Sequence, residues 1–207
     1  MQYAAVGHEV VVGSRAIERA EETVKELKEA WPSRSLKLVA SDNAAAAHAD
    51  VVVVATPWEG ALATVKDHAE ALAGKLVISM ANAVGKWGKA MVPLLPPTGS
   101  VTAAIALALP SSKVAGAFHH LPAGPWADLD HPLECDVLVV AEKRAVAREV
   151  VALVDELPGL RGVDAGVLAN AAPIEALTAT LIGINIRYKT HTAVKLTGLP
   201  AGHEGRH

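Results

Sequence analysis

Short apolar runs alternate along the chain with longer amphipathic segments, and this alternation predicts the order of strands and helices. Seven runs have the length of a β-strand: residues 8–14, 35–41, 50–56, 75–81, 113–119, 136–142 and, with a weaker pattern, 160–166. The runs DVVVVAT and DVLVVAE are almost continuous in valine, which is typical of parallel strands buried on both faces. The pattern therefore predicts an α/β fold, with a mainly parallel sheet covered by helices on both faces.

The segments between these runs have helical periodicity. Residues 15–31 place their apolar side chains on one helical face, and Pro32 ends this helix. A second helix starts after a turn at Pro57 and ends near Gly74. Residues 85–97 are rich in glycine, lysine and proline, so they predict a loop. The apolar segment after Ala165 predicts a buried helix of about 20 residues, which could also pair with a second copy of the chain.

Composition narrows the class of protein. Half of the 207 residues are hydrophobic but 3% are aromatic, so alanine, valine and leucine must fill the core. A net charge of −3, with acids and bases mixed, gives no bulk attraction to nucleic acid or to anionic membranes. The sequence also lacks an apolar run of the roughly 18 residues that a membrane span needs. These features predict a cytoplasmic protein that binds small molecules.

Cys135 is the single cysteine of the sequence, which excludes an internal disulfide and fits a reducing compartment. A nucleophilic thiol is one interpretation of this residue, because His131 and Glu134 are close in sequence. The alternative, which we favour, is an inert and partly buried cysteine at the start of a strand.

In open α/β sheets, ligands bind at the carboxyl ends of the strands, so the residues that follow each run are the candidate site. The first run ends in Ser14 and Arg15, and Arg19 follows one helical turn later. A hydroxyl and two guanidinium groups suit the 2′-phosphate of NADP, whereas an NAD site would place an acid here. The alternative is a capping serine beside a solvated arginine.

Two further turns could line a dinucleotide. The third run is followed by Thr56, Pro57 and Trp58, which could face the ligand or could form a helix cap with a packing tryptophan. The fourth run ends in Met80, Ala81 and Asn82. Asn82 could bind a carboxamide, although capping a turn is the commoner role.

The stretch AFHHLPAG is the most unusual in the sequence. His119 and His120 should point to opposite sides of the chain, so at most one of them faces a cleft. A metal site is not expected, because neither acids nor further histidines at ligand spacing accompany the pair. Leu121, Pro122 and Ala123 then give a backbone with small side chains that a flat ring could approach closely. Core histidines followed by a turn are the alternative.

In this order, the segments GHEVVVGSR, VVVVATPWEGAL, VISMANAV, AFHHLPAGPWADLDHPLECDVLV, LPGLRGVDAGVLANAAPIEALTATLIGIN and RYKTHTAVKLTGLP resemble the NADPH-dependent oxidoreductases that reduce the deazaflavin coenzyme F420. The resemblance runs from Gly7 to Pro200. It implies a Rossmann-like NADP-binding domain at residues 1–164 and a C-terminal helical segment and tail at 165–207. It also implies a homodimer that transfers a hydride between NADP(H) and F420.

The resemblance gives roles to the candidate residues. Ser14 and Arg15 would hold the 2′-phosphate with help from Arg19. Thr56 lies in the turn over which the dinucleotide would run, and Pro57, Trp58, Met80, Ala81 and Asn82 would line it. His119, His120, Leu121, Pro122 and Ala123 would lie where the two rings meet. Direct hydride transfer between stacked rings needs no protein nucleophile, so these residues are expected to align the rings.

The family begins with a strand, a glycine-rich phosphate loop and a helix, of which MQYAAV matches the end of the helix alone. Without a central strand, the sheet should contain a hydrophobic slot, and the chain should bind NADP weakly. Two other functions remain open for the chain. One is an NADP-dependent reductase of a ferric or imine acceptor, and the other is a truncated, non-catalytic NADP-binding remnant.

Overall fold

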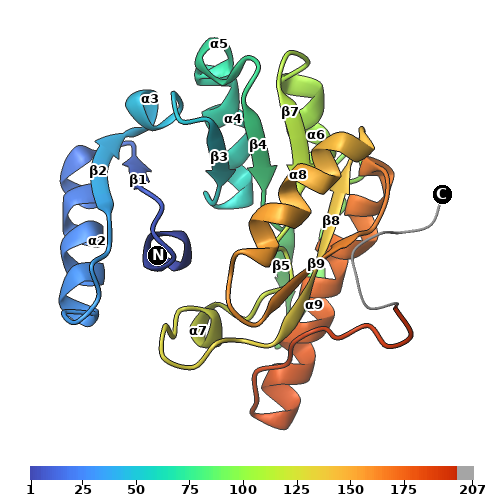
Figure 1. Ribbon diagram of the computed structural model, residues 1–207. Helices are drawn as coiled ribbons and strands as arrows, with labels where there is room; N and C mark the ends of the chain where they lie inside the picture. Colours follow the sequence, from blue (N-terminus) through green and yellow to red (C-terminus); the bar gives the residue numbers. More distant parts are fainter. Residues whose placement is uncertain (200–207) are drawn as a thin grey trace.

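The computed structural model describes residues 1–199, and the predicted tail at 201–207 lies outside the described part. Each of the seven apolar runs forms a strand (Figure 1). The strands are β1 (Val10–Ser14), β2 (Leu38–Asp42), β3 (Val51–Val54), β4 (Leu76–Ser79), β7 (Lys113–Gly116), β8 (Cys135–Ala141) and β9 (Leu160–Asp164).

Helices separate the strands as the periodicity predicts. They are α1 (Gln2–Ala5), α2 (Ile17–Ala30), α3 (Asn43–Ala46), α4 (Trp58–Asp67), α5 (Ala69–Leu72), α6 (Val101–Ala108), α7 (Ala123–Trp126), α8 (Arg144–Asp155) and α9 (Ala171–Tyr188), with a 3₁₀ turn at Leu168–Asn170. The helix predicted between Pro57 and Gly74 is interrupted at His68, where the backbone leaves helical geometry.

The prediction of a mainly parallel sheet is confirmed. Strands β3, β4, β7, β8 and β9 form one sheet in that order, and β1 and β2 form a separate parallel pair. The exception to parallel pairing in the large sheet is the short ladder between β7 and β8. Helix α8 packs with β7 and β8 in one core, and α4 and α6 cover β3 and β4 in another. Valine and alanine supply most of both cores, as the composition requires.

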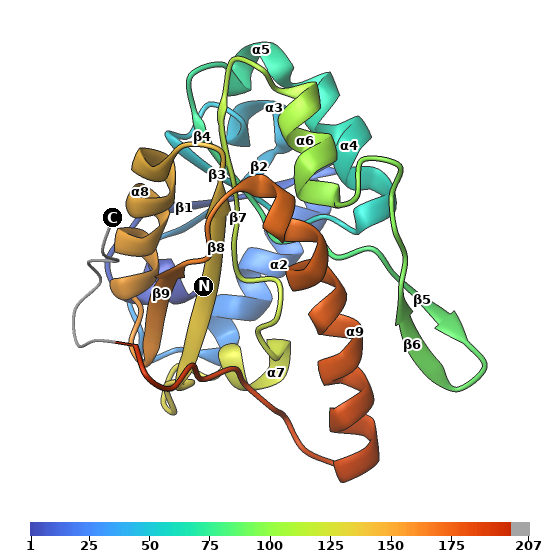
Figure 2. The same cartoon turned by 90° about the vertical axis from the view of Figure 1, so that its right-hand side faces the viewer.

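The prediction of a loop at residues 85–97 is wrong for residues 85–93. The chain there forms an antiparallel hairpin of β5 (Val84–Trp87) and β6 (Ala90–Pro93). Gly88 has φ +60°, which provides the tight two-residue turn between the strands. The hairpin lies against α9 (Figure 2), so its strands are stabilised by a helix distant in sequence and not by the large sheet.

The helix predicted after Ala165 is α9, and its burial is partial. Ala171, Ile174, Glu175 and Ala179 are buried, whereas the last turn is exposed. The chain then returns to the large sheet, where Asp136 N donates to Val194 O at 2.8 Å. The division of the chain at residue 164 stays a prediction.

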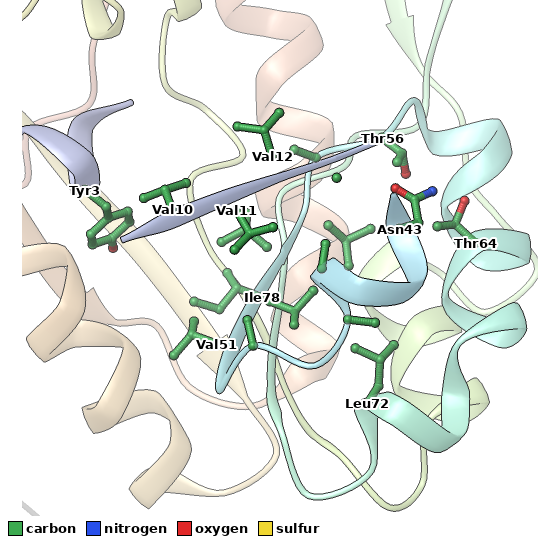
Figure 3. A pocket seen from close by; sticks show the side chains of 18 of the residues that line it. Tyr3, Val10, Val11, Val12, Asn43, Val51, Thr56, Thr64, Leu72 and Ile78 are labelled. Atoms are coloured by element: carbon green, nitrogen blue, oxygen red, sulfur yellow. The ribbon is translucent and has the colours of Figure 1, made fainter. Parts of the chain in front are cut away.

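An apolar cavity of about 530 Å³ separates β1 from β3. Valines of both strands line it, and Tyr3, Leu72 and Ile78 close its sides (Figure 3). The expected hydrophobic slot is therefore present. It lies between the facing edges of two parallel sheets that share no ladder.

Candidate functional site

The carboxyl ends of β1, β3, β4 and β7 carry the residues that the sequence singled out. Parallel pairing of β1 with β2, and of β3 with β4 and β7, directs these ends toward one edge of each sheet. This arrangement is where open α/β sheets bind ligands.

The turn from β1 to α2 is cationic and has free donors. Ser14 Oγ accepts a weak hydrogen bond from Ala16 N at 3.4 Å. The guanidinium groups of Arg15 and Arg19 are exposed, and neither has a hydrogen-bond or ion-pair partner among residues 1–199. Helix α2 also begins without a side-chain cap. Asp42 lies opposite Ser14 in the strand register, but its carboxylate caps α3 through Ala45 N. The turn therefore fits a phosphate group.

The turn from β3 to α4 contains two orphaned polar atoms. Thr56 Oγ1 and Trp58 Nε1 are buried and have no hydrogen-bond partner within residues 1–199. Pro57 directly precedes α4 and cannot donate a hydrogen bond. Thr56 lies with Asn43 and Thr64 at the polar end of the cavity (Figure 3). Buried polar atoms without partners are rare, and a polar ligand at this turn would satisfy them.

The turn after β4 is held by internal hydrogen bonds. Asn82 Nδ2 donates to His119 O at 2.8 Å, and Thr178 Oγ1 of α9 donates to the same oxygen at 2.8 Å. Ala81 is buried and Met80 is half-buried. These contacts favour the structural role for Asn82 over binding of a carboxamide.

The two histidines contact different elements. His119 Nε2 lies 3.5 Å from Thr102 Oγ1 of α6, whereas His120 Nε2 accepts from Leu138 N of β8 at 3.3 Å. Both side chains are buried. His120 therefore satisfies a strand amide beyond the end of the short β7–β8 ladder, which is a structural task. The backbone before this pair is unusual, because Phe118 has φ +64°.

Burial keeps both imidazoles neutral. It lowers the pKa of His119 to about 4, and the adjacent His120 adds to this shift, while the carbonyls of Ala81 and Met80 oppose it in part. Burial also lowers the pKa of His120. Neither ring carries an acidic proton near neutral pH, so the pair is suited to positioning and not to proton donation.

The segment after the histidines and Cys135 complete the predicted set. Leu121 and Pro122 are half-buried, and Ala123 is exposed at the start of α7. Cys135 is buried 4.0 Å from His120 Nδ1, and burial raises the pKa of its thiol. A protonated and inaccessible thiol supports the inert alternative for this cysteine.

Glu175 is the residue that the sequence analysis missed. Its carboxylate is buried in α9 and accepts hydrogen bonds from Val101 N at 2.8 Å, from Thr102 N at 2.9 Å and from Thr102 Oγ1 at 2.8 Å. Ser100 Oγ accepts from Ala103 N, so the free amides of the first turn of α6 are satisfied. Burial raises the pKa of Glu175, and the three donors oppose this rise. The sequence did contain one signal for this residue, because Glu175 is a single acidic residue within the apolar run APIEALT.

A mainly parallel sheet, with cations and unsatisfied hydroxyl and indole groups at its carboxyl ends, defines the class of Rossmann-like dinucleotide-binding proteins. Within the described residues, none of the helices has both the length and the apolarity to cross a bilayer.

Comparison with known proteins gives the family. A family model described as NADP oxidoreductase, coenzyme F420-dependent, matches residues 1–83. The F420-dependent NADP reductase of Methanocaldococcus jannaschii is 36% identical, over 94% of this chain and 90% of that protein. The enzyme of the same name from Methanothermobacter marburgensis is 30% identical, over 97% of this chain and 92% of that protein. The chain therefore belongs to the family of F420-dependent NADP reductases.

A solved structure supports the fold. A protein from Arthrobacter sp. FB24, described provisionally as an F420-dependent NADP reductase, superposes with a TM-score of 0.74 and covers 94% of each chain at 23% identity. The two proteins therefore share one fold over 94% of this chain.

The buried neutral state of His119 predicts a pH dependence of stability. Its pKa is lower in the folded chain than the ordinary 6.5, so the unfolded chain binds more protons and stability falls as the pH drops from 6.5 toward 4. This residue should contribute up to about 3 kcal/mol to that loss. Urea titrations of wild type and His119→Gln at neutral pH and at pH 4 test this. Between these two pH values, the free energy of unfolding of wild type should fall by about 3 kcal/mol more than that of His119→Gln. A constant difference would contradict the assignment, and His48→Gln, at an exposed histidine, is the control.

The three donors on Glu175 predict a stability effect. Glu175→Ala leaves buried amides without acceptors and should lower the free energy of unfolding by about 3 kcal/mol. Glu175→Gln keeps an acceptor and should cost about half as much. Glu149, exposed on α8 and paired with Lys113, is the matched control, and Glu149→Ala should change stability by less than about 1 kcal/mol. Similar losses for both alanine variants in urea denaturation would rule out the capping role.

Proposed function

We propose that this chain is an oxidoreductase that transfers a hydride between NADP(H) and the deazaflavin coenzyme F420. The observation that carries the proposal is the 36% identity, over 94% of the chain, to an F420-dependent NADP reductase. The unpartnered guanidinium groups beside Ser14 add support, because they fit a cofactor that carries a phosphate on its ribose. A cytoplasmic location belongs to the same proposal and is supported by Cys135, which is a free thiol.

The adenosine end of NADP is assigned to the turn after β1. The hydroxyl of Ser14 and the guanidinium of Arg15 bind the 2′-phosphate, and Arg19 contributes a second positive charge from the first turn of α2. The free arginines and the uncapped start of α2 support this assignment. A planar guanidinium can form two parallel hydrogen bonds to a phosphate, which a lysine cannot do.

The central part of the cofactor is assigned to the turns after β3 and β4. The hydroxyl of Thr56 and the indole N–H of Trp58 bind polar atoms of the cofactor. Neither group has a hydrogen-bond partner within residues 1–199. Pro57 keeps the start of α4 free of a competing donor. Met80 and Ala81 supply an apolar wall. Asn82 fixes the turn through its hydrogen bond to the carbonyl oxygen of His119.

The ring junction is assigned to residues 119–123. His119 and His120 act as neutral positioning groups beneath it, because both rings are buried and His120 Nε2 accepts a hydrogen bond from Leu138 N of β8. Leu121, Pro122 and Ala123 present a backbone that a flat ring can approach. The two cofactors together supply the chemistry of hydride transfer, and the chain aligns them and excludes water.

Homodimerisation is part of the proposal. Trp87 on the β5–β6 hairpin is 80% exposed, and Ile186 and Tyr188 in the last turn of α9 are 61% and 71% exposed. The hairpin and the helix lie side by side (Figure 2), so they offer one apolar surface to a second copy.

The dimer proposal predicts that substitutions on this surface lower the mass of the protein in solution. Wild type should elute in size-exclusion chromatography with light scattering at twice its mass of 21.4 kDa. The double variant Trp87→Ser and Ile186→Ser should remove apolar contact area and shift the chain to monomer. Leu107→Ser, at an equally exposed leucine of α6, should leave the dimer intact. A monomeric wild type, or a dimer that survives the double substitution, would refute this surface.

The 2′-phosphate assignment predicts a selective loss of cofactor binding. Arg15→Ala should raise the dissociation constant for NADPH by roughly tenfold to a hundredfold and change that for NADH by less than about twofold. Binding is measured by calorimetry, and reduction of F420 by NADPH is followed at the deazaflavin absorbance band. Arg148→Ala on α8 is the matched control. Equal losses for both nucleotides would contradict the phosphate site, and NADPH binding without any F420 reduction would support the non-catalytic alternative.

A further inference from the structure

Phe118 has a backbone conformation that its side chain does not favour. It follows the end of β7 by two residues and directly precedes His119, and its φ is +64°. A positive φ is unusual for a bulky residue, because Cβ then lies too close to the backbone. Lys189, with φ +51°, is the other non-glycine case among residues 1–199, and it ends a helix, where this conformation is common. Phe118 ends no helix, so its contacts must hold its conformation.

The side chain of Phe118 supplies these contacts. It is 2% exposed, and its ring stacks on the ring of Trp126 in α7, with 5.4 Å between the ring centroids and 15° between the ring planes. The ring of Tyr3 meets it edge-on, at 6.5 Å and 86°. Both arrangements are favourable for aromatic pairs. The burial and stacking of one large ring therefore stabilise a backbone conformation that costs free energy by itself.

The stack closes a loop around the proposed ring junction. Phe118 directly precedes residues 119–123, and Trp126 follows them by three positions. Inside the loop, Trp126 N donates to Pro122 O at 3.0 Å. Trp126 is also held from outside, because Gln2 Nε2 of α1 donates to its carbonyl oxygen. A loop whose two ends are joined has fewer conformations available to it than an open one.

The turn at Phe118 lies between two fixed points of the backbone. Before it, Ala117 N donates to Ser79 O at 3.0 Å, so the chain still follows β4. After it, the carbonyl oxygen of His119 accepts hydrogen bonds from two side chains of other elements. The chain leaves β4 between these two points. The conformation of Phe118 therefore governs the direction in which residues 119–123 start.

We propose that Phe118 and Trp126 are positioning residues for hydride transfer, and that their stacked rings hold residues 119–123 in the conformation that aligns the two cofactor rings. Both act through the loop that they close. The inference rests on the proposed function, because it uses the assignment of the ring junction to this loop. A displacement of about 1 Å in an aligning group can slow a reaction about a hundredfold. The stack should therefore affect the hydride-transfer step more than the affinity for NADPH, whose phosphate is assigned to the distant turn after β1.

A purely structural role for the stack predicts a different result. If the two rings only filled the core, the loss of any comparable tryptophan would slow the reaction to a similar extent. Trp31, at the end of α2, provides this comparison. It is half-buried, as Trp126 is, and packs in the core between α2 and the β1–β2 pair.

Four variants of the full 207-residue chain test the proposal. Phe118→Leu and Trp126→Leu each remove one ring of the stack and keep an apolar side chain. Trp126→Phe keeps a ring that can stack. Trp31→Leu is the matched control.

The stack itself is measured by NMR without any ligand. Phe118 is the single phenylalanine of the sequence, so labelled phenylalanine gives one backbone signal and one ring. The stacked indole should shift the ring protons of Phe118 upfield. Trp126→Leu should abolish this shift and weaken the strong NOE between the amide and Hα protons that a positive φ produces. Trp126→Phe and Trp31→Leu should retain both features.

The role in hydride transfer is measured by single-turnover reduction of F420 at saturating NADPH. Phe118→Leu and Trp126→Leu should lower the rate constant roughly tenfold to a hundredfold and change the dissociation constant for NADPH by less than about twofold. Trp126→Phe should keep the rate constant within about threefold of wild type, and Trp31→Leu within about twofold.

Three outcomes would overturn the proposal. Ring signals of Phe118 that do not move in Trp126→Leu would mean that the two rings do not stack. Equal losses of rate in Trp126→Leu and Trp31→Leu would mean that the stack contributes to stability alone. A wild type that does not reduce F420 would refute the proposed function and, with it, the role in hydride transfer. The Phe118 signals need no cofactor, so they distinguish this last outcome from the first.

Discussion

The architecture depends on one constraint, which is that the backbone groups of a buried parallel sheet need partners on both edges of each inner strand. Strand β4 meets it fully, because it pairs along its whole length with β3 on one side and with β7 on the other. Strands β1 and β3 meet it on one edge only. Their valine sequences would suit inner strands, so the apolar side chains of these two strands do not match the pairing of their backbone.

This constraint also governs the candidate site. The NADP-binding residues proposed here divide between two sheets: Ser14 and Arg15 follow β1, and Thr56 and Trp58 follow β3. A dinucleotide must contact both groups at once, so its affinity depends on how firmly the sheets are aligned. Within the described chain no ladder joins β1 to β3, so backbone pairing does not fix the distance between these two groups of residues.

The other side of the site is fixed without the sheet ladder. The ladder between β7 and β8 is short, and side chains from other elements supply the hydrogen-bond partners that the ladder does not. His120 satisfies an amide of β8, Asn82 and Thr178 hold the carbonyl of His119, and Glu175 joins α9 to the start of α6. Because these groups are buried or half-buried and are hydrogen-bonded, they hold the loop that carries the proposed ring junction in place. Neutral positioning groups suit hydride transfer, which requires alignment more than proton transfer.

The sequence by itself determined the seven strands, the α/β class and the family, because hydrophobic periodicity and strings of family motifs are local in the chain. It also indicated the hydrophobic slot. It did not determine the β5–β6 hairpin, since its support comes from α9 some 80 residues away, nor the role of Glu175, whose partners lie 73 and 74 residues away. The burial of both histidines likewise follows from packing between distant elements. Contacts of this kind depend on how the elements come together in space, so the tertiary structure alone decided them.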